Sequence, residues 1–257
     1  MLQILKFCNI IGCSFRVLVD YIYGSKGKFI MNNDASVVTE NFVEGTGLKI
    51  RRCFYHFVKR TFDIVLSFIG CLFLLPMALI IKIFNMLSGD FAPVIYSQNR
   101  IGLNGKEFRF YKFRSMIPNA DEVLFKLLEE NEDLAREYKL NKKLDNDPRI
   151  TKIGKFIRKT SIDELPQLIN VLKGDMSLIG NRPYLPREKD DMGIYFNTIV
   201  KTKPGLTGYW QVNGRSETSF GERLTLEQYY SRHASLKLDI KIFFKTFSVV
   251  LLHKGSK

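Results

Sequence analysis

The longest apolar stretch in the chain runs from Ile64 to Ile81 without a charged side chain, and Lys82 closes it. About 18 apolar residues is the lower limit for a helix that crosses the hydrocarbon core of a membrane. Pro76 lies inside the stretch, where a proline removes one backbone hydrogen bond and kinks a helix. The pattern therefore predicts a bent helix in a membrane. Basic residues precede it, at Arg51, Arg52, Lys59 and Arg60.

Positive charges flank both ends of this stretch. A helix that spans a membrane once usually carries its positive charge mainly on the cytoplasmic side. Positive ends with a break between them favour a re-entrant helix over residues 51–87, which enters the membrane, bends and returns to the same face. An ordinary kinked transmembrane helix and a buried helix of a soluble protein remain open alternatives.

Residues 1–50 carry less information. The apolar segment Phe7–Val19 is interrupted by polar residues and is too short to span a bilayer. Gly24–Gly47 is polar and contains glycine, which is typical of a linker. We therefore expect residues 1–50 to be an N-terminal extension or linker, with Met31 as an alternative start of translation.

Residues 93–116 read as two β-strands joined by a hairpin turn at Asn104-Gly105. Apolar and basic residues alternate in the second strand, so one face is buried and the other presents basic side chains. The candidates on that face are Arg109, Lys112 and Arg114. Side chains tend to converge at the end of a strand, and this favours Arg114 as a phosphate contact over a merely solvated residue.

Two amphipathic helices complete the pattern. Asp121–Leu140 has apolar residues at helical spacing, which predicts packing. From Ser235 on, aromatic and aliphatic residues alternate with lysines, as in a helix that lies on an anionic bilayer, although a docked globular helix has a similar pattern. The predicted fold class is α/β: a membrane-embedded re-entrant helix with interfacial amphipathic helices and a small β-hairpin or sheet, carrying a cytosolic catalytic domain over residues 88–257.

The net charge narrows the class of partner. Its formal value of +13 at pH 7 requires an anionic partner: nucleic acid, acidic lipid headgroups or phosphorylated small molecules. The sequence has no zinc-finger spacing, basic-leucine heptads or RNP-type motif, and this argues against nucleic acid. No cysteine follows Cys71, which suits a domain in the cytosol.

Asp163 and Glu164 form an acidic pair within basic surroundings, which suggests a carboxylate that acts on a phosphorylated substrate. Local rules alone favour a structural role. Ser161-x-x-Glu164 is a capping-box pattern, whereas Pro166 moves the expected helix start towards Asp163. If Asp163 is to reach phosphorus, Ser161 is the expected capping side chain.

Several arginines around the pair are candidates for phosphate contacts. Arg149 and Arg158 precede it, and Arg182 follows it, between Asn181 and Pro183. A later loop rich in glycine ends at Arg215, whose guanidinium is another fork-shaped donor for phosphate.

Taken together, the motifs make the chain resemble the bacterial sugar transferase family, the monotopic phosphoglycosyl transferases, from about Lys59 to the C-terminus. Six motifs occur in the family's order. They are Lys59-Arg60-x-x-Asp63, Tyr111-Lys112-Phe113-Arg114-Ser115-Met116, Asp147-x-Arg149-x-Thr151, Thr160-Ser161-Ile162-Asp163-Glu164-Leu165-Pro166-Gln167, Met176-Ser177-Leu178-Ile179-Gly180-x-Arg182-Pro183 and Lys203-Pro204-Gly205-Leu206-Thr207-Gly208.

The resemblance implies a two-step transfer. Asp163 would attack the β-phosphate of a UDP-sugar, with Mg²⁺ held at Asp163 and the pyrophosphate, to release UMP and leave a phosphosugar-aspartate. Undecaprenyl (polyprenyl) phosphate would then take the phosphosugar, activated or positioned by Glu164. By position, Arg158 and Arg182 match basic residues near the phosphates.

The membrane segment also matches the family. Lys59, Arg60 and Asp63 correspond to the motif that anchors the re-entrant helix and the lipid phosphate region, and Pro76 falls at the family's helix break, which favours the re-entrant topology. One departure is Leu75, where the family often has serine. In a second departure, the usual Gly-Pro-Arg-Pro reads Gly180-Asn181-Arg182-Pro183.

The C-terminal half looks most like the catalytic portion of galactose-1-phosphate transferases. The family begins exopolysaccharide, capsule, O-antigen (lipopolysaccharide) or glycoprotein glycan synthesis, and this implies the bacterial inner (plasma) membrane with the catalytic domain on the cytoplasmic face. The expected partners are a UDP-sugar, undecaprenyl phosphate and an anionic membrane, without nucleic acid, and the family allows a homodimer. The alternative is a non-catalytic basic membrane-surface scaffold or a nucleic-acid-binding protein.

Overall fold

The computed structural model describes residues 35–142, 144–214 and 218–251. The chain divides into two compact units, residues 1–62 and 63–257, and the second is described here by itself. Helix α3 (Ala35–Cys71) includes residues that were predicted as linker, so that prediction is wrong from Ala35 on. The expectations for residues 1–34, Met31 among them, lie outside the described residues.

Helix α3 is followed, after a break at Leu72 and Phe73, by α4 (Leu74–Leu87), and the two helices are bent by 44°. Within the described part of the chain no single helix is long and apolar enough to cross a membrane, although this bent pair passes the test together. Pro76 lies in the first turn of α4, four residues after Leu72. In a continuous helix the backbone N–H of residue 76 would donate to the carbonyl of Leu72, and proline has no N–H, so the break falls where Pro76 removes that hydrogen bond, as predicted.

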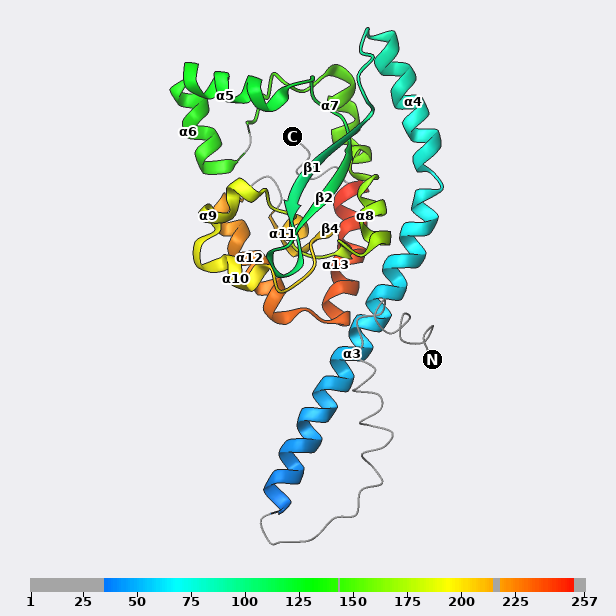
Figure 1. Cartoon of the computed structure of the whole chain (residues 1–257), viewed down its shortest axis with the longest axis vertical. Helices are drawn as coiled ribbons and strands as arrows, with labels where there is room; N and C mark the ends of the chain where they lie inside the picture. Colours follow the sequence, from blue (N-terminus) through cyan, green and yellow to red (C-terminus); the bar gives the residue numbers. More distant parts are fainter. Residues whose placement is uncertain (1–34, 143, 215–217, 252–257) are drawn as a thin grey trace. The chain divides into compact units, whose positions relative to one another are not determined.

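The predicted hairpin is present. Strand β1 (Ile95–Ile101) pairs antiparallel with β2 (Glu107–Phe113). Both turn residues have positive φ, +56° at Asn104 and +77° at Gly105, as the turn signal requires. The hairpin lies against α8 (Gln167–Lys173), as Figure 1 shows, and the Asn170 side chain joins them by accepting from Tyr111 N and donating to Arg109 O.

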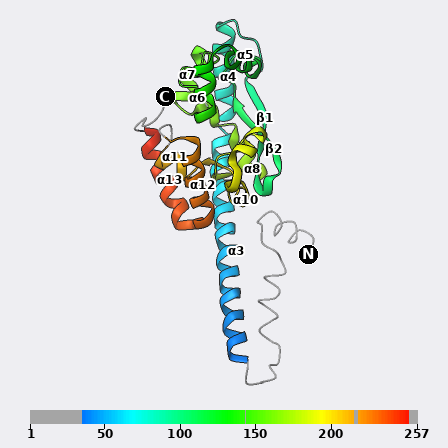
Figure 2. The same ribbon diagram turned by 90° about the vertical axis from the view of Figure 1, so that its left-hand side faces the viewer.

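The helix predicted over Asp121–Leu140 is two helices, α5 (Ala120–Glu130) and α6 (Glu132–Asn141), which lie together in both views (Figures 1 and 2). The reason for the interruption is Asn131, whose side chain accepts hydrogen bonds from Asp133 N and Leu134 N and so caps a new helix. Hydrophobic spacing alone does not show this cap.

The rest of the unit is built from short elements. Strand β3 (Ser177–Ile179) pairs parallel with β4 (Gly205–Thr207), and Gly205 is required there because a Cβ would lie 2.1 Å from Gly180 N. The predicted mixture of helices with a small hairpin and sheet is thus observed. The remaining elements are α7 (Lys152–Lys159), η2 (Ile162–Glu164), η3 (Pro186–Glu188), α9 (Lys189–Met192), η4 (Gly193–Tyr195), α10 (Phe196–Ile199), α11 (Tyr209–Asn213), α12 (Phe220–His233) and α13 (Leu236–Leu251).

Helix α13 has one docked face and one apolar exposed face. Ile242 is buried in a core cluster with Tyr230, and the hydroxyl of Tyr230 donates to Asp239 at 2.8 Å. On the other face Phe244 is 67% exposed and Phe247 is 54% exposed. The docked alternative is therefore correct for the first face, and the second retains the apolar pattern that predicted a bilayer contact.

Candidate active site

A cavity of about 1380 Å³ brings together five of the seven predicted catalytic and phosphate-binding residues. Its walls come from the β1–β2 hairpin, the α5–α6 pair, the segment before α7, η2, the loop after β3, and α11 and α13. Five predicted residues line it: Asp163, Glu164, Arg149, Arg158 and Arg182. Arg215 lies outside the described residues.

The acidic pair sits in a short 3₁₀ turn that precedes the helix. Ser161 adopts a left-handed conformation (φ +57°) and its side chain makes no capping hydrogen bond, so the prediction of a Ser161 cap is wrong. Helix α8 begins only after Pro166, which occupies its N-cap position. Because η2 has its own backbone geometry, Asp163 is not used as a helix cap and faces the cavity.

Asp163 is a buried carboxylate beside one lysine. It is 5% exposed, and its Oδ2 lies 3.7 Å from Lys112 Nζ, which also donates to Glu164 Oε1 at 3.1 Å. Burial raises the pKa of Asp163, and the neighbouring Glu164 charge adds to this, while Lys112 and then Arg158 oppose it. Lys112 is therefore the main cation that holds Asp163 ionised.

Lys112 was named as one of three candidates and passed over for Arg114. Alternation places both on the same face of the hairpin, but β2 ends at Phe113 and the chain turns there. Arg114 instead pairs with Asp90 at 2.9 Å and donates to Pro93 O at 2.8 Å, and it does not line the cavity. The arrangement gives no support to Arg114 as a phosphate contact.

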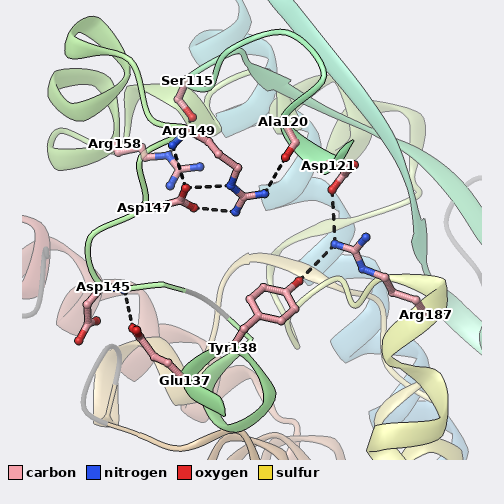
Figure 3. Close-up of polar contacts among 10 residues, drawn as sticks. All are labelled: Ser115, Ala120, Asp121, Glu137, Tyr138, Asp145, Asp147, Arg149, Arg158 and Arg187. Atoms are coloured by element: carbon pink, nitrogen blue, oxygen red, sulfur yellow. Dashed lines mark hydrogen bonds and ion pairs between the residues drawn. The ribbon is translucent and has the colours of Figure 1, made fainter. Parts of the chain in front are cut away.

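Arg149 and Arg158 are held by polar partners, as Figure 3 shows. Arg149 Nε donates to Asp147 Oδ1 at 2.8 Å and its second amino group to Oδ2 at 2.6 Å, in a buried ion pair. Arg158 Nε donates to Ser115 Oγ at 2.8 Å. Burial alone would raise the pKa of Asp147, but the hydrogen bonds from Arg149 outweigh it, and the pKa is lowered.

Arg182 lines the cavity together with a second arginine that sequence reasoning missed. Arg100 on β1 lines the cavity, donates to Pro183 O at 3.0 Å, and lies close enough to Arg182 for the two charges to repel. The Nε atoms of both guanidiniums are buried without a hydrogen-bond partner. Burial lowers the pKa of Arg100 to about 10, so it remains cationic at neutral pH.

Part of the cavity lining is a polar bridge from η3 to the α5–α6 pair. Arg187 donates to the hydroxyl of Tyr138 at 3.3 Å and lies 3.5 Å from Asp121 (Figure 3). Glu137, on α6, accepts from Asp145 N at 2.7 Å. These contacts hold η3 and the segment after α6 to the α5–α6 pair.

Asp63, in the second half of α3, makes the contacts that join this helix to β3. Its carboxylate is buried and accepts from Ser177 Oγ at 3.0 Å and from Leu178 N at 2.8 Å, and these bonds fasten the helix to β3. Lys59 and Arg60 also lie on α3, in the other unit, where the Lys59 ammonium lies 5.9 Å from the Tyr55 ring centre.

The carboxylates of the site are too few to hold a metal ion without additional ligands from a substrate. Among the described residues no group of three or more histidine, cysteine or carboxylate side chains could hold a metal. Mg²⁺, however, usually binds through one or two carboxylates together with substrate phosphates. Asp163 and Glu164 at the cavity wall supply such carboxylates, so the site fits Mg²⁺ that arrives with a pyrophosphate.

Comparison with known proteins gives a consistent picture. The family model described as bacterial sugar transferase matches residues 54–253. The undecaprenyl-phosphate galactose phosphotransferase of Salmonella typhimurium is 48% identical over 205 residues, covering 78% of this chain and 42% of that protein. The UDP-galactose-lipid carrier transferase of Erwinia amylovora is 42% identical over 241 residues, covering 91% and 48%.

A shorter relative matches over most of its length. The exopolysaccharide production protein ExoY of Rhizobium meliloti is 39% identical over 201 residues, which cover 77% of this chain and 87% of that protein. The chain thus spans less than half the length of the first two relatives and most of the third.

Proposed function

Because the chain belongs to the bacterial sugar transferase family, we propose that it transfers a sugar-1-phosphate from a UDP-sugar to undecaprenyl phosphate and releases UMP. The observation that carries the proposal is buried Asp163, 3.7 Å from Lys112 and beside Arg158, in a cavity large enough for a nucleotide-sugar. The names of the relatives favour galactose as the sugar.

In the first step an Oδ atom of Asp163 forms a bond to the β-phosphorus of the UDP-sugar. The bond from that phosphorus to the bridging oxygen breaks, and UMP leaves with the electron pair. The cavity is lined by four arginines, whose fixed positive charge suits the electrostatic stabilisation of a phosphoryl transfer. They are Arg100, Arg149, Arg158 and Arg182.

In the second step an oxygen of the lipid phosphate attacks the same phosphorus and displaces the carboxylate of Asp163. The sugar diphosphate lipid leaves, and Asp163 is regenerated without an oxidant or reductant. Glu164, 32% exposed and held by Lys112 at 3.1 Å, is placed to position or activate the incoming phosphate. Mg²⁺ at Asp163 would supply positive charge that screens the pyrophosphate from the carboxylates.

The outer surface of α4 suits a membrane. Leu75 is 80% exposed, Leu87 is 79% exposed, and the side chains between them on that surface are also large and apolar. We propose that the bent α3–α4 pair is re-entrant in the bacterial inner membrane, with α13 at the interface, the catalytic unit on the cytoplasmic face, and Lys59 and Arg60 near lipid phosphates.

The test of the activity is a screen for UMP release from UDP-galactose, UDP-glucose and UDP-N-acetylhexosamines, with and without undecaprenyl phosphate. We expect release with lipid present, and most with UDP-galactose. A basic scaffold or nucleic-acid binder would release no UMP with any donor, and in the nucleic-acid case its binding would weaken steeply with salt. That result would refute the proposed function.

Replacing Lys112 with methionine should shift the pH dependence of the reaction. Lys112 is the strongest influence that lowers the pKa of Asp163, so its removal raises that pKa further. Since the ionised carboxylate is the nucleophile, the acid limb of the pH–rate profile should move to higher pH. Lys112→Arg keeps the charge and should shift it less. An unmoved limb in Lys112→Met would contradict the assignment of that limb to Asp163.

The topology can be tested with single cysteines at Arg51 and Ser88, on either side of the bent pair, in a background without the native cysteines. A re-entrant pair places both at the cytoplasmic face. A membrane-impermeant maleimide should then label neither in intact cells and both after permeabilisation. Labelling of one position alone from outside would establish a spanning helix instead.

A further inference from the structure

A buried carboxylate lies directly behind Arg182. Glu227 on α12 is 0% exposed, and its Oε1 accepts a hydrogen bond from the backbone N–H of Arg182 at 2.8 Å. The carboxylate also interacts with the hydroxyl of Tyr184. Burial of a carboxylate costs stability, so the presence of Glu227 beside the cavity calls for an explanation other than packing.

The surroundings of Glu227 are strongly basic. Arg182 and Arg100 line the cavity, whereas Arg223 is buried behind it, with its guanidinium 4.5 Å from the ring centre of Trp210. The guanidiniums in this cluster outnumber its two carboxylates, Glu227 and Glu188, so the cluster carries an excess of positive charge. The charged and titratable groups around Glu227 are Arg182 and Tyr184 from the loop after β3, Arg223 from α12 itself, Arg100 from β1 and Glu188 from η3.

We propose that Glu227 is a positioning residue for the transfer reaction: it fixes the backbone of Arg182 so that this guanidinium, next to Arg100, faces the anionic substrate in the cavity. The inference rests on the proposed function, since it takes the substrate to be a nucleoside diphosphate sugar. Glu227 itself does not line the cavity and touches no reacting atom.

The charge of Glu227 also changes near neutral pH. Burial raises its pKa to about 7, against the opposing effects of the Tyr184 hydroxyl, the Arg182 N–H and the charges of Arg182 and Arg223. The neutral carboxyl group still has a carbonyl oxygen that accepts from Arg182. Protonation therefore keeps the position of Arg182 and raises the excess positive charge of the cluster, so anion binding should strengthen as the pH falls through about 7.

The test is a double-mutant cycle on UMP release with Glu227→Ala, Glu227→Gln and Arg182→Ala. Glu227→Ala removes the acceptor, and a small displacement of Arg182 should lower kcat/KM on the order of 10- to 100-fold, mainly through KM for the UDP-sugar. Glu227→Gln retains the acceptor and should keep most of the activity. In the Arg182→Ala background, Glu227→Ala should have little further effect, because Glu227 acts through Arg182.

Additive losses, or equal losses in Glu227→Ala and Glu227→Gln, would overturn the inference while leaving the proposed function intact. Thr225→Ala, exposed on the same helix, is the matched control and should behave as wild type. The same cycle measured by UDP binding, through the fluorescence of Trp210, does not depend on turnover and so decides the inference even where the screen finds no UMP release.

A second measurement tests the inference if Glu227→Ala does not fold. If Glu227→Ala fails to fold, UDP affinity is compared between wild type and Glu227→Gln across pH 7. The affinity of wild type for UDP should rise as the pH falls and Glu227 becomes protonated. The glutamine variant is neutral at position 227 at every pH, so it should bind UDP as tightly as protonated wild type throughout and lack the change in affinity near pH 7. Identical pH profiles would overturn the inference.

Discussion

Replacing Asp163 with asparagine should abolish UMP release, by about 10⁴-fold or more, because an amide does not replace a carboxylate as the nucleophile towards phosphorus. With a UDP-sugar labelled in the sugar and no lipid acceptor, wild type should retain label on the protein after acid quenching, at Asp163. The variant should retain none. Label found at Glu164, or retained in Asp163→Asn, would refute the assignment of the nucleophile.

Two controls separate this loss of chemistry from a loss of structure. Asp163 is 5% exposed and its environment raises its pKa, so the folded protein disfavours its charge. Protonated Asp163 therefore contributes to the free energy of unfolding. This contribution is fully present below the ordinary pKa of 3.8 and is lost as the pH rises through the raised pKa of the folded state. Asp163→Asn should therefore not lower the unfolding midpoint at neutral pH. Glu164→Gln should still form the labelled adduct but pass it to lipid more slowly.

Asp147→Ala should cost about 3–5 kcal/mol of stability, because it leaves the guanidinium of Arg149 buried without its carboxylate. The pair forms part of the cavity wall beside Arg158 (Figure 3), so activity should fall with stability. Urea unfolding of the detergent-solubilised protein, followed by fluorescence of its single tryptophan, measures the loss.

The matched control removes both charges at once. Asp147→Asn combined with Arg149→Leu leaves no buried charge and keeps an oxygen that can accept from the backbone N–H of residue 149, as Asp147 Oδ1 does. Most of the lost stability should return. If Asp147→Ala alone lowers the free energy of unfolding by less than about 1 kcal/mol, the pair does not hold this wall together.

Features set by neighbouring residues were predicted well. The apolar run Ile64–Ile81 predicted a bent helical pair, and Asn104-Gly105 predicted the hairpin, because membrane length and left-handed turn geometry are local constraints. The motif order identified the family, and the acidic pair and three of the five predicted arginines do line one cavity.

Predictions of helix ends from the local sequence failed where two neighbouring residues each favoured a different end point. Asn131 divided a helix that its hydrophobic spacing joined, and the left-handed Ser161 replaced an expected cap. In each case the choice between two permitted backbone conformations falls within one turn, where spacing carries no information.

By itself, the sequence determined the family, the acidic pair at Asp163 and the hairpin that faces it. Only the tertiary structure decided which cations serve that pair. Lys112 reaches Glu164 across 52 positions, and Glu227 holds Arg182 across 45. The burial and the electrostatic environment of a side chain depend on residues that packing brings together from distant parts of the chain. The local pattern of apolar and polar positions does not predict these long-range contacts.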